Sequence, residues 1–109
     1  MTITQSTQGA WTVLTLTGKL DHAGSESLKQ TLAPHLTGGA LALDFGGVDY
    51  ITSNGFRVLM LAEKEQRLKG GRFILGHLSP PVARFFEIAG LDTLFKITPD
   101  LPAALAADT

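Results

Sequence analysis

The chain has 109 residues with a formal net charge of -1 and a pI near 6.2, and 44% of its residues are hydrophobic while 17% are charged. A chain of this length can build one hydrophobic core but not two, and the composition is that of a globular domain rather than a disordered segment. The balanced charge gives no electrostatic footprint for direct nucleic-acid binding, and the absence of cysteine excludes disulfides, thiolate metal sites and cysteine catalysis.

The first two predicted strands are Thr2–Thr7 and Trp11–Thr17. β-Branched and apolar residues alternate along the second strand, as expected for a pleated surface with one buried face. The short link between the strands contains Gly9, which favours a β-hairpin. We expect the chain to leave the sheet at residues 18–21.

The first predicted helix is Ser25–Leu36. Leucines recur there at every fourth position, which turns one narrow apolar stripe toward the core. These leucines are Leu28, Leu32 and Leu36. Pro34 is expected to shorten or distort the last turn, because proline lacks the N–H that a helix interior needs. Gly38 and Gly39 then end the segment in the manner of a helix C-cap.

The most apolar strand is predicted at Ala40–Phe45, with the continuous hydrophobic character of a central strand in a parallel sheet. A glycine-bearing loop is expected after it, followed by a long helix at Ser53–Lys69. The residues of this helix expected to face the core are Val58, Leu59, Leu61, Ala62 and Leu68. Those expected to face water are Glu63, Lys64, Gln66, Arg67 and Lys69.

The rest of the chain continues the alternation of strands and helices. We predict a strand at Arg72–His77, a helix that begins after Ser79 and ends at Gly90, a strand at Leu94–Thr98 and a terminal helix at Pro99–Ala107. The resulting order is β-β-α-β-α-β-α-β-α. Because strands separated by helices pair in parallel, we expect an α/β fold in which residues 1–109 form one domain, with helices packed on a mixed sheet of about five strands.

The location of the protein is also suggested by what the chain lacks. Its first six residues do not show a basic segment followed by an apolar one, so they do not resemble a signal peptide. No uninterrupted apolar run approaches the length of a membrane span. We therefore expect a cytoplasmic protein that contacts neither membrane nor nucleic acid directly.

Catalytic and metal-binding interpretations each lack a required residue. Ser53, His22 and Asp21 supply the residue types of a hydrolytic triad, but adjacent side chains are poorly placed for the carboxylate to orient the imidazole. No Gly-x-Ser-x-Gly elbow surrounds the serine, and Gly46-Gly47 is not followed by the Gly-Lys-Ser/Thr of a phosphate-binding loop. The three histidines share no metal-ligand spacing and are expected on the surface or in loops. We expect no catalytic residue, metal ion or cofactor.

Thr52 and Ser53 stand where the long helix is predicted to begin, and two interpretations are open there. One of these hydroxyls can cap the helix by accepting a hydrogen bond from a free backbone N–H, which is worth about 1 kcal/mol. Alternatively, Ser53 accepts a phosphate, because a helix N-terminus tolerates negative charge through its dipole and its free N–H groups. Such a modification leaves the fold intact but changes the surface presented to a partner.

The segment Asp44–Leu59 resembles the signature loop and helix of STAS domains, the anti-sigma factor antagonists of bacteria. Two further segments resemble the family in the correct order. The first, Gly18–Gln30, begins Gly-Lys-Leu-Asp-His, and the second, Pro81–Phe95, begins Pro-Val-Ala-Arg-Phe-Phe-Glu-Ile-Ala-Gly-Leu. The likeness covers nearly the whole chain, and it implies a STAS-like α/β domain without enzymatic activity.

The resemblance implies a partner-switching function. Unphosphorylated, such a protein binds an anti-sigma factor that is also a serine protein kinase with an ATPase-like fold, and so regulates sigma-factor-dependent transcription. The kinase phosphorylates the serine that corresponds to Ser53, and a PP2C-type phosphatase restores it. The partner-binding residues implied by the resemblance are Asp21, His22, Thr52, Ser53, Asn54 and Arg57.

Two positions depart from the family pattern. An aspartate often precedes the phosphoacceptor, whereas Thr52 stands here, and Asn54 replaces the usual serine or alanine after it. Thr52 is therefore an alternative phosphoacceptor. The alternative function is that of an adaptor that works without phosphorylation, as a STAS subunit of a transport or stress-sensing assembly.

Overall fold

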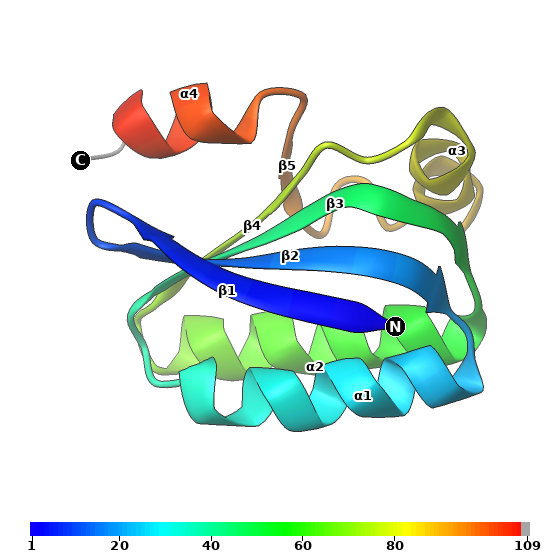
Figure 1. The fold of residues 1–109 in the computed structure, drawn as a ribbon, viewed down its shortest axis with the longest axis horizontal. Helices are drawn as coiled ribbons and strands as arrows, with labels where there is room; N and C mark the ends of the chain where they lie inside the picture. Colours follow the sequence, from blue (N-terminus) through cyan, green and yellow to red (C-terminus); the bar gives the residue numbers. More distant parts are fainter. Residues whose placement is uncertain (108–109) are drawn as a thin grey trace.

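A computed structural model describes residues 1–107, in which five strands form one sheet and four α-helices pack around it (Figure 1). The strands are β1 (Thr2–Gln8), β2 (Trp11–Leu20), β3 (Ala40–Ile51), β4 (Arg72–Gly76) and β5 (Lys96–Thr98). The helices are α1 (His22–Leu32), α2 (Ser53–Leu68), α3 (Pro80–Ile88) and α4 (Leu101–Ala107), with a 3-10 turn, η1, at Ala33–His35.

The strands lie in the sheet in chain order, β1-β2-β3-β4-β5. Strand β1 is antiparallel to β2, and each of the other neighbouring pairs is parallel. This arrangement confirms the predicted α/β fold class, with a mixed sheet of five strands.

Helices α1 and α2 lie on one face of the sheet, and α4 lies over the other face (Figure 1). Each of α1 and α2 connects a parallel strand to the next one, and the sheet grows in the same direction at both steps. Because such crossovers are right-handed, both helices are placed on the same face. Both also begin at the sheet edge where β2 and β3 end.

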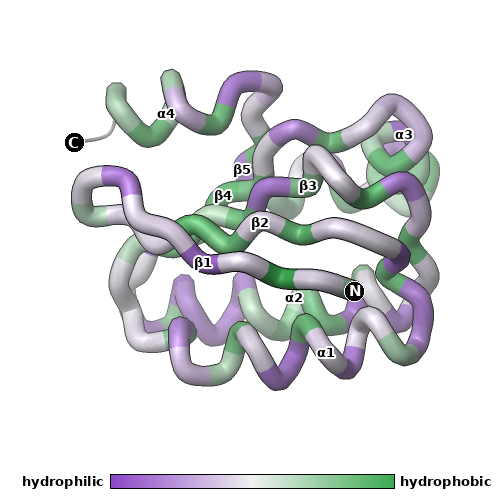
Figure 2. The backbone as a smooth tube through the Cα atoms, in the orientation of Figure 1, coloured by the Kyte–Doolittle hydropathy of each residue, from purple (hydrophilic) through white to green (hydrophobic). Residues whose placement is uncertain are grey.

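Side-chain alternation along the strands separates two cores. The paired residues Leu14 and Leu43 belong to the larger core, to which α1, α2 and α3 contribute. A smaller core lies on the opposite face, beneath α4. Its members are Trp11, Val13, Ala42, Ile74, Leu101 and Leu105. Figure 2 shows the hydrophobic stretches in the strands and the mixed hydropathy along α1 and α2.

Strands β2 and β3 are both longer than predicted. The expected strands end at Thr17 and Phe45, but the structure continues them to Leu20 and Ile51. The extensions pair with each other in parallel, with irregularities in register between Thr15 and Thr17 and again after Gly18. The expected glycine-bearing loop is therefore mainly strand, because a partner segment distant in sequence satisfies its backbone.

Helix α1 begins three residues earlier than the predicted Ser25. The reason is the carboxylate of Asp21, whose Oδ1 accepts a hydrogen bond from the N–H of Gly24 at 2.9 Å and caps the helix. The helix ends at Leu32, and Pro34 lies in the 3-10 turn that follows, as the missing proline N–H predicts.

Helix α2 has the predicted limits to within one residue, but the predicted orientation of several side chains is wrong. Leu59 and Ala62 are buried as expected, whereas Leu61 and Leu68 are 59% and 71% exposed. Gln66, expected to face water, has an exposed fraction of 0%. Its amide bonds to the loop that precedes β3 and to the first residue of β4.

The later elements match their predictions in type, with shorter ends. Strand β5 begins at Lys96 rather than Leu94, and α4 begins at Leu101 rather than Pro99. Within residues 1–107, no helix is both long and apolar enough to cross a membrane.

Candidate functional site

The ends of β2 and β3 are tied together at the edge of the sheet where α1 and α2 begin. Leu20 is the last residue of β2, and its carbonyl oxygen accepts two hydrogen bonds from Thr52. The backbone N–H of Thr52 donates at 3.0 Å, and its hydroxyl donates at 3.1 Å. These bonds hold the first turn of α2 beside the first turn of α1.

Thr52 is the N-cap of α2 by position, with an extended backbone at φ -109° and ψ 176°, but its side chain makes no capping hydrogen bond. The predicted capping role of its hydroxyl is therefore wrong. The hydroxyl donates its hydrogen bond to the carbonyl of Leu20 instead, and the local sequence of α2 gives no sign of that acceptor. The first backbone N–H groups of α2 consequently face outward without this cap.

Ser53 is exposed and is the first residue of α2. Helical hydrogen bonding begins beside it, where the N–H of Phe56 donates to the carbonyl of Thr52 at 3.2 Å. The hydroxyl of Ser53 thus stands at the positive end of the helix dipole, which favours an anion. Arg57, also exposed, follows one helical turn later.

Asp21 and His22 lie at the start of α1, and only Asp21 has a defined local role. Its half-buried carboxylate bonds the N–H of Gly24. A side chain at Gly24 would collide with the carbonyl of Lys19, so only glycine fits this turn. His22 is exposed. The carboxylate of Asp21 serves the helix cap rather than the imidazole of a triad.

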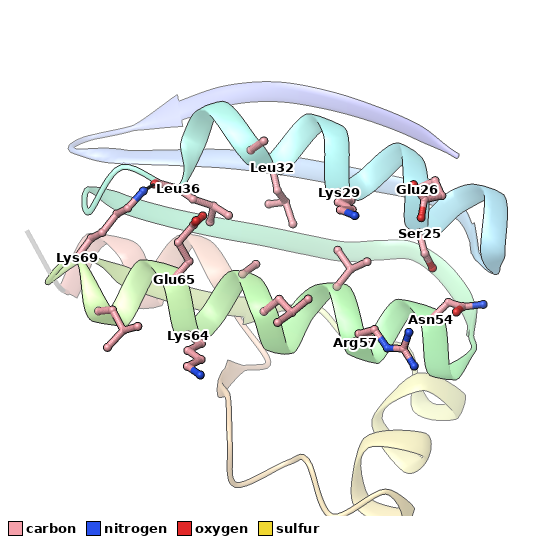
Figure 3. Close-up of a pocket in the computed structure, with 15 residues that line it drawn as sticks. Ser25, Glu26, Lys29, Leu32, Leu36, Asn54, Arg57, Lys64, Glu65 and Lys69 are labelled. Atoms are coloured by element: carbon pink, nitrogen blue, oxygen red, sulfur yellow. Dashed lines mark hydrogen bonds between the residues drawn. The ribbon is translucent and has the colours of Figure 1, made fainter.

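The residues predicted for the site therefore occupy the first turns of two neighbouring helices. Thr52, Ser53, Asn54 and Arg57 begin α2, and Asp21 with His22 begins α1. Figure 3 shows Asn54 and Arg57 at the end of the α1/α2 pair where Ser25 and Glu26 of α1 also lie. The structure brings the sequence-predicted residues to one edge of the molecule.

An apolar groove between α1 and α2, which we call the α1/α2 groove, was not expected from the sequence. It has a volume of about 650 Å³ and continues from the first turns of the two helices along their length (Figure 3). The exposed Leu61 and Leu68 line it, so the residues that fail to reach the core form this surface. The helical spacing of Val58, Leu61 and Leu68 in α2 is a signal that could have revealed it.

A second cluster, not expected from the sequence, joins Asp44 within β3 and His77 just after β4 to the start of α4. The Nδ1 atom of His77 lies 3.2 Å from Oδ1 of Asp44, and its Nε2 accepts a hydrogen bond from the N–H of Leu101 at 3.1 Å. Asp44 and His77 lie close together because Asp44 pairs with Gly76, the residue before His77. Among residues 1–107, no group of three or more histidine, aspartate or glutamate residues is placed to hold a metal ion.

These features define a small α/β domain with an exposed serine at a helix N-terminus, beside the start of a second helix. A family model described as "Mlab, STAS domain" matches residues 3–99. The chain belongs to the STAS-domain family.

Individual relatives agree with this assignment. A protein of Bordetella bronchiseptica whose name describes it as an anti-sigma factor antagonist, BtrV, is 37% identical over 94 residues, which cover 84% of this chain and 81% of that protein. A Thermotoga maritima structure described in the same terms, tm1081, has a TM-score of 0.87 at 20% identity and covers 96% of this chain and 92% of its own.

The fold is also that of the Bacillus cell fate determinant SpoIIAA, solved in its phosphorylated form. That structure has a TM-score of 0.73 at 18% identity, over 99% of this chain and 100% of that one. At such identities the two solved structures establish the fold alone. The Bordetella sequence and the family model establish the family.

Proposed function

We propose that this protein is an anti-sigma factor antagonist that acts as a phosphorylation-controlled partner-switching module. In its unphosphorylated form it binds an anti-sigma factor that is also a serine protein kinase with an ATPase-like fold, and so regulates sigma-factor-dependent transcription. A PP2C-type phosphatase resets it. The observation that carries the proposal is the exposed Ser53 at the first position of α2.

Ser53 is a better phosphate acceptor than Thr52. The hydroxyl of Thr52 is half-buried and donates to the carbonyl of Leu20, so phosphorylation there would break a bond that holds the two helices together. The hydroxyl of Ser53 faces solvent. A phosphate there adds about two negative charges at a helix N-terminus, where the dipole and free N–H groups accommodate them.

The surrounding surface explains how one phosphate changes partner binding. Asp21, His22 and Asn54 surround the start of the two helices, and the guanidinium of Arg57 lies one turn from Ser53. A partner fitted to a neutral hydroxyl would meet a dianion after phosphorylation. Arg57 then has a new acceptor on its own helix, and charge-assisted bonds of this kind are about twice as strong as neutral ones.

The proposal assigns no catalysis to the chain, and names from relatives support it. BtrV is named as an anti-sigma factor antagonist, and SpoIIAA has been obtained phosphorylated. The carboxylate that a serine hydrolase would need is engaged in capping α1. We expect no hydrolysis of activated esters that depends on Ser53.

The decisive experiment combines phosphorylation and binding. Incubation with a serine kinase of the anti-sigma factor class from the same organism, with Mg-ATP, should place one phosphate on the wild-type protein. Ser53→Ala should receive none, whereas Thr52→Val, the matched control, should still be phosphorylated. Ser53→Asp should bind the kinase at least about tenfold more weakly than Ser53→Ala, a difference of ~1.4 kcal/mol. Equal binding of the alanine and aspartate variants contradicts the switch.

One observation favours the adaptor alternative. Thr52 replaces the carboxylate that often precedes the phosphoacceptor in the family. Its hydroxyl donates to the carbonyl of Leu20 in β2 and so is not available to a kinase. An adaptor predicts a constitutive complex that is indifferent to phosphate. Pull-down of wild-type and Ser53→Asp proteins, followed by mass spectrometry, distinguishes the two functions, because only the adaptor retains the same partners in both.

A further inference from the structure

The α1/α2 groove has the size and lining of a small-molecule site. Its volume of about 650 Å³ falls within the range of roughly 300–1,000 Å³ that is usual for ligand pockets. The apolar part of the lining comes from both helices and leaves large side chains uncovered, with Leu61 59% and Leu68 71% exposed. The other apolar lining residues are Leu32, Ala33, Leu36, Val58 and Ala62.

A polar group without a partner lies at one end of the groove. Ser25 is only 2% exposed, and within residues 1–107 its Oγ has no hydrogen-bond partner. Figure 3 shows its side chain projecting from α1 toward α2, at the end where Asn54 lies. A buried hydroxyl left without a partner costs about 1–3 kcal/mol, so this position requires an explanation. A ligand atom that reaches the hydroxyl provides one.

The charged side chains that line the groove indicate whether a ligand group near Ser25 is anionic or cationic. The cationic side chains in the lining are Lys29, Arg57, Lys64 and Lys69, against Glu26 and Glu65, although the whole protein has a formal net charge of -1. Both helices also begin at the Ser25 end, so two positive dipole ends point there. At the Ser25 end, Lys29, Arg57 and the two helix N-termini outweigh one carboxylate, that of Glu26, so this end favours an anionic group.

The far end of the groove is bounded by a side-chain crossing. Nζ of Lys69 donates to the carbonyl oxygen of Leu36 at 2.6 Å and joins the end of α2 to the segment after α1 (Figure 3). From Ser25 to Leu36 the helical rise corresponds to about 16 Å. The groove is thus a short apolar channel with an anion-attracting end and a closed end.

We propose that the α1/α2 groove binds a linear amphiphile with a terminal carboxylate, of the medium-chain fatty acid class. Its carboxylate accepts a hydrogen bond from Ser25 and is neutralised by Lys29 and Arg57. Its alkyl chain lies along Leu32 and Leu61 and ends before the Lys69 crossing. The charge of the Ser25 end decides for this occupant: Lys29, Arg57 and the two helix N-termini match a terminal carboxylate, whereas the backbone of a partner helix would bring no negative charge and would rest on the exposed leucines at the rim.

Calorimetric titration of the purified chain with laurate, below its critical micelle concentration, tests the proposal. We expect one binding site. Ser25→Ala should weaken laurate binding by about tenfold, the loss of one hydrogen bond to a charged group. Ser27→Ala, on the same helix but outside the groove lining, is the matched control and should bind as the wild type does. Dodecanol, which lacks the carboxylate, should bind at least about tenfold more weakly.

A second variant distinguishes loss of laurate binding from loss of folding, and amide chemical shifts show where laurate binds. Leu61→Asp changes an exposed residue, so the variant should fold, as circular dichroism will show, and yet lose laurate binding. Amide chemical shifts should change along α1 and α2 and not at α4. Absence of laurate binding, equal affinity for dodecanol, or unchanged affinity in Ser25→Ala overturns the proposal. No kinase or phosphate enters the titration, so its failure leaves the partner-switching function untouched.

Discussion

At the scale of single residues, Gln66 joins the end of α2 to two loops. Its Oε1 accepts a hydrogen bond from the N–H of Gly38 at 3.1 Å, and its Nε2 donates to the carbonyls of Gly39 and Arg72 at 2.8 and 3.2 Å. A side chain on Gly71 would come within 2.7 Å of the Gln66 amide carbon, so a glycine is needed beside it. One amide thus bonds three backbone groups in the loop before β3 and at the start of β4, and one of them, the carbonyl of Gly39, also accepts a hydrogen bond from the N–H of Arg72 at 2.8 Å.

Replacement of Gln66 by leucine should destabilise the fold. The volume is nearly kept, so the loss is that of the hydrogen bonds to Gln66, and the loss of the acceptor for the N–H of Gly38 costs about 1–3 kcal/mol. Urea unfolding measures the difference in free energy of unfolding. Gln30→Leu, at an exposed position of α1, is the control and should change stability by less than about 0.5 kcal/mol. Equal stability of the two variants would show that the network contributes nothing.

The exposed position of Ser53 could be predicted from sequence, because the helix start and the preceding apolar strand are local signals. The burial of Gln66 and the hydroxyl direction of Thr52 could not. Both side chains bond to backbone atoms of segments distant in sequence, the loop before β3 and the end of β2. The hydropathy pattern of α2 predicts that a glutamine between charged residues faces water, because the pattern of one helix contains no information about the loops that pack beside it.

At the scale of elements, Gly55 determines how closely α2 approaches the sheet. It is buried in the first turn, and an added Cβ would lie 2.8 Å from Cγ1 of Ile51, 3.1 Å from Cβ of Leu20 and 3.2 Å from the carbonyl oxygen of Leu20. That carbonyl is the acceptor that holds Thr52. The glycine therefore places the start of α2, and Ser53 with it, against the ends of β2 and β3.

Gly55→Ala should destabilise the protein, although alanine is favoured over glycine in a helix interior by about 1 kcal/mol. The methyl group must displace buried side chains and a hydrogen-bonded carbonyl, and overpacking of this kind typically costs about 1–3 kcal/mol. Thermal unfolding and hydrogen exchange of the first turn of α2 measure the effect. Gly39→Ala, whose Cβ would meet its nearest neighbour at 3.7 Å, is the control. A Gly55→Ala protein more stable than the wild type would mean that helix propensity dominates.

The order and type of the elements were predictable because apolar periodicity lies within each element, and the glycine or proline residues that end an element lie next to it in the sequence. The lengths of β2 and β3 were not. Residues 18–20 and 46–51 look like loops in isolation, and they become strand because the two segments pair with each other across a helix connection. The start of α1 differs from the prediction for a similar reason: leucine periodicity begins at Leu28 and does not indicate that the carboxylate of Asp21 caps the helix upstream of it.

At the scale of the whole molecule, α4 covers the sheet face opposite α1 and α2. Leu101 and Leu105 are 2% and 0% exposed and pack in one cluster with Trp11. The N–H of Leu101 donates to His77, which in turn contacts Asp44, so the start of α4 is linked to the middle of β3 and to the residue that follows β4. The last helix therefore covers the sheet, and it lies away from Ser53 and the first turns of α1 and α2.

This arrangement predicts that Leu105→Ala loosens α4 before the rest of the fold. The larger core beneath α1, α2 and α3 shares no residue with the cluster beneath α4, so it should remain packed. Removal of a fully buried leucine side chain costs about 2–5 kcal/mol. Trp11 is the one tryptophan of the sequence and is 3% exposed beneath α4, so its fluorescence reports the change directly. We expect red-shifted emission and faster amide exchange in α4.

Leu68→Ala, at a residue 71% exposed, removes the same number of carbons from the other face and is the matched control. It should leave the Trp11 emission unchanged and lower the free energy of unfolding by less than about 0.5 kcal/mol. Because the Leu105 variant keeps the edge formed by β2, β3 and the first turn of α2, it should still be phosphorylated at Ser53 under the proposed function. Loss of phosphorylation together with the emission shift would mean that the two faces of the sheet unfold as one unit, against the separate cores seen in the structure.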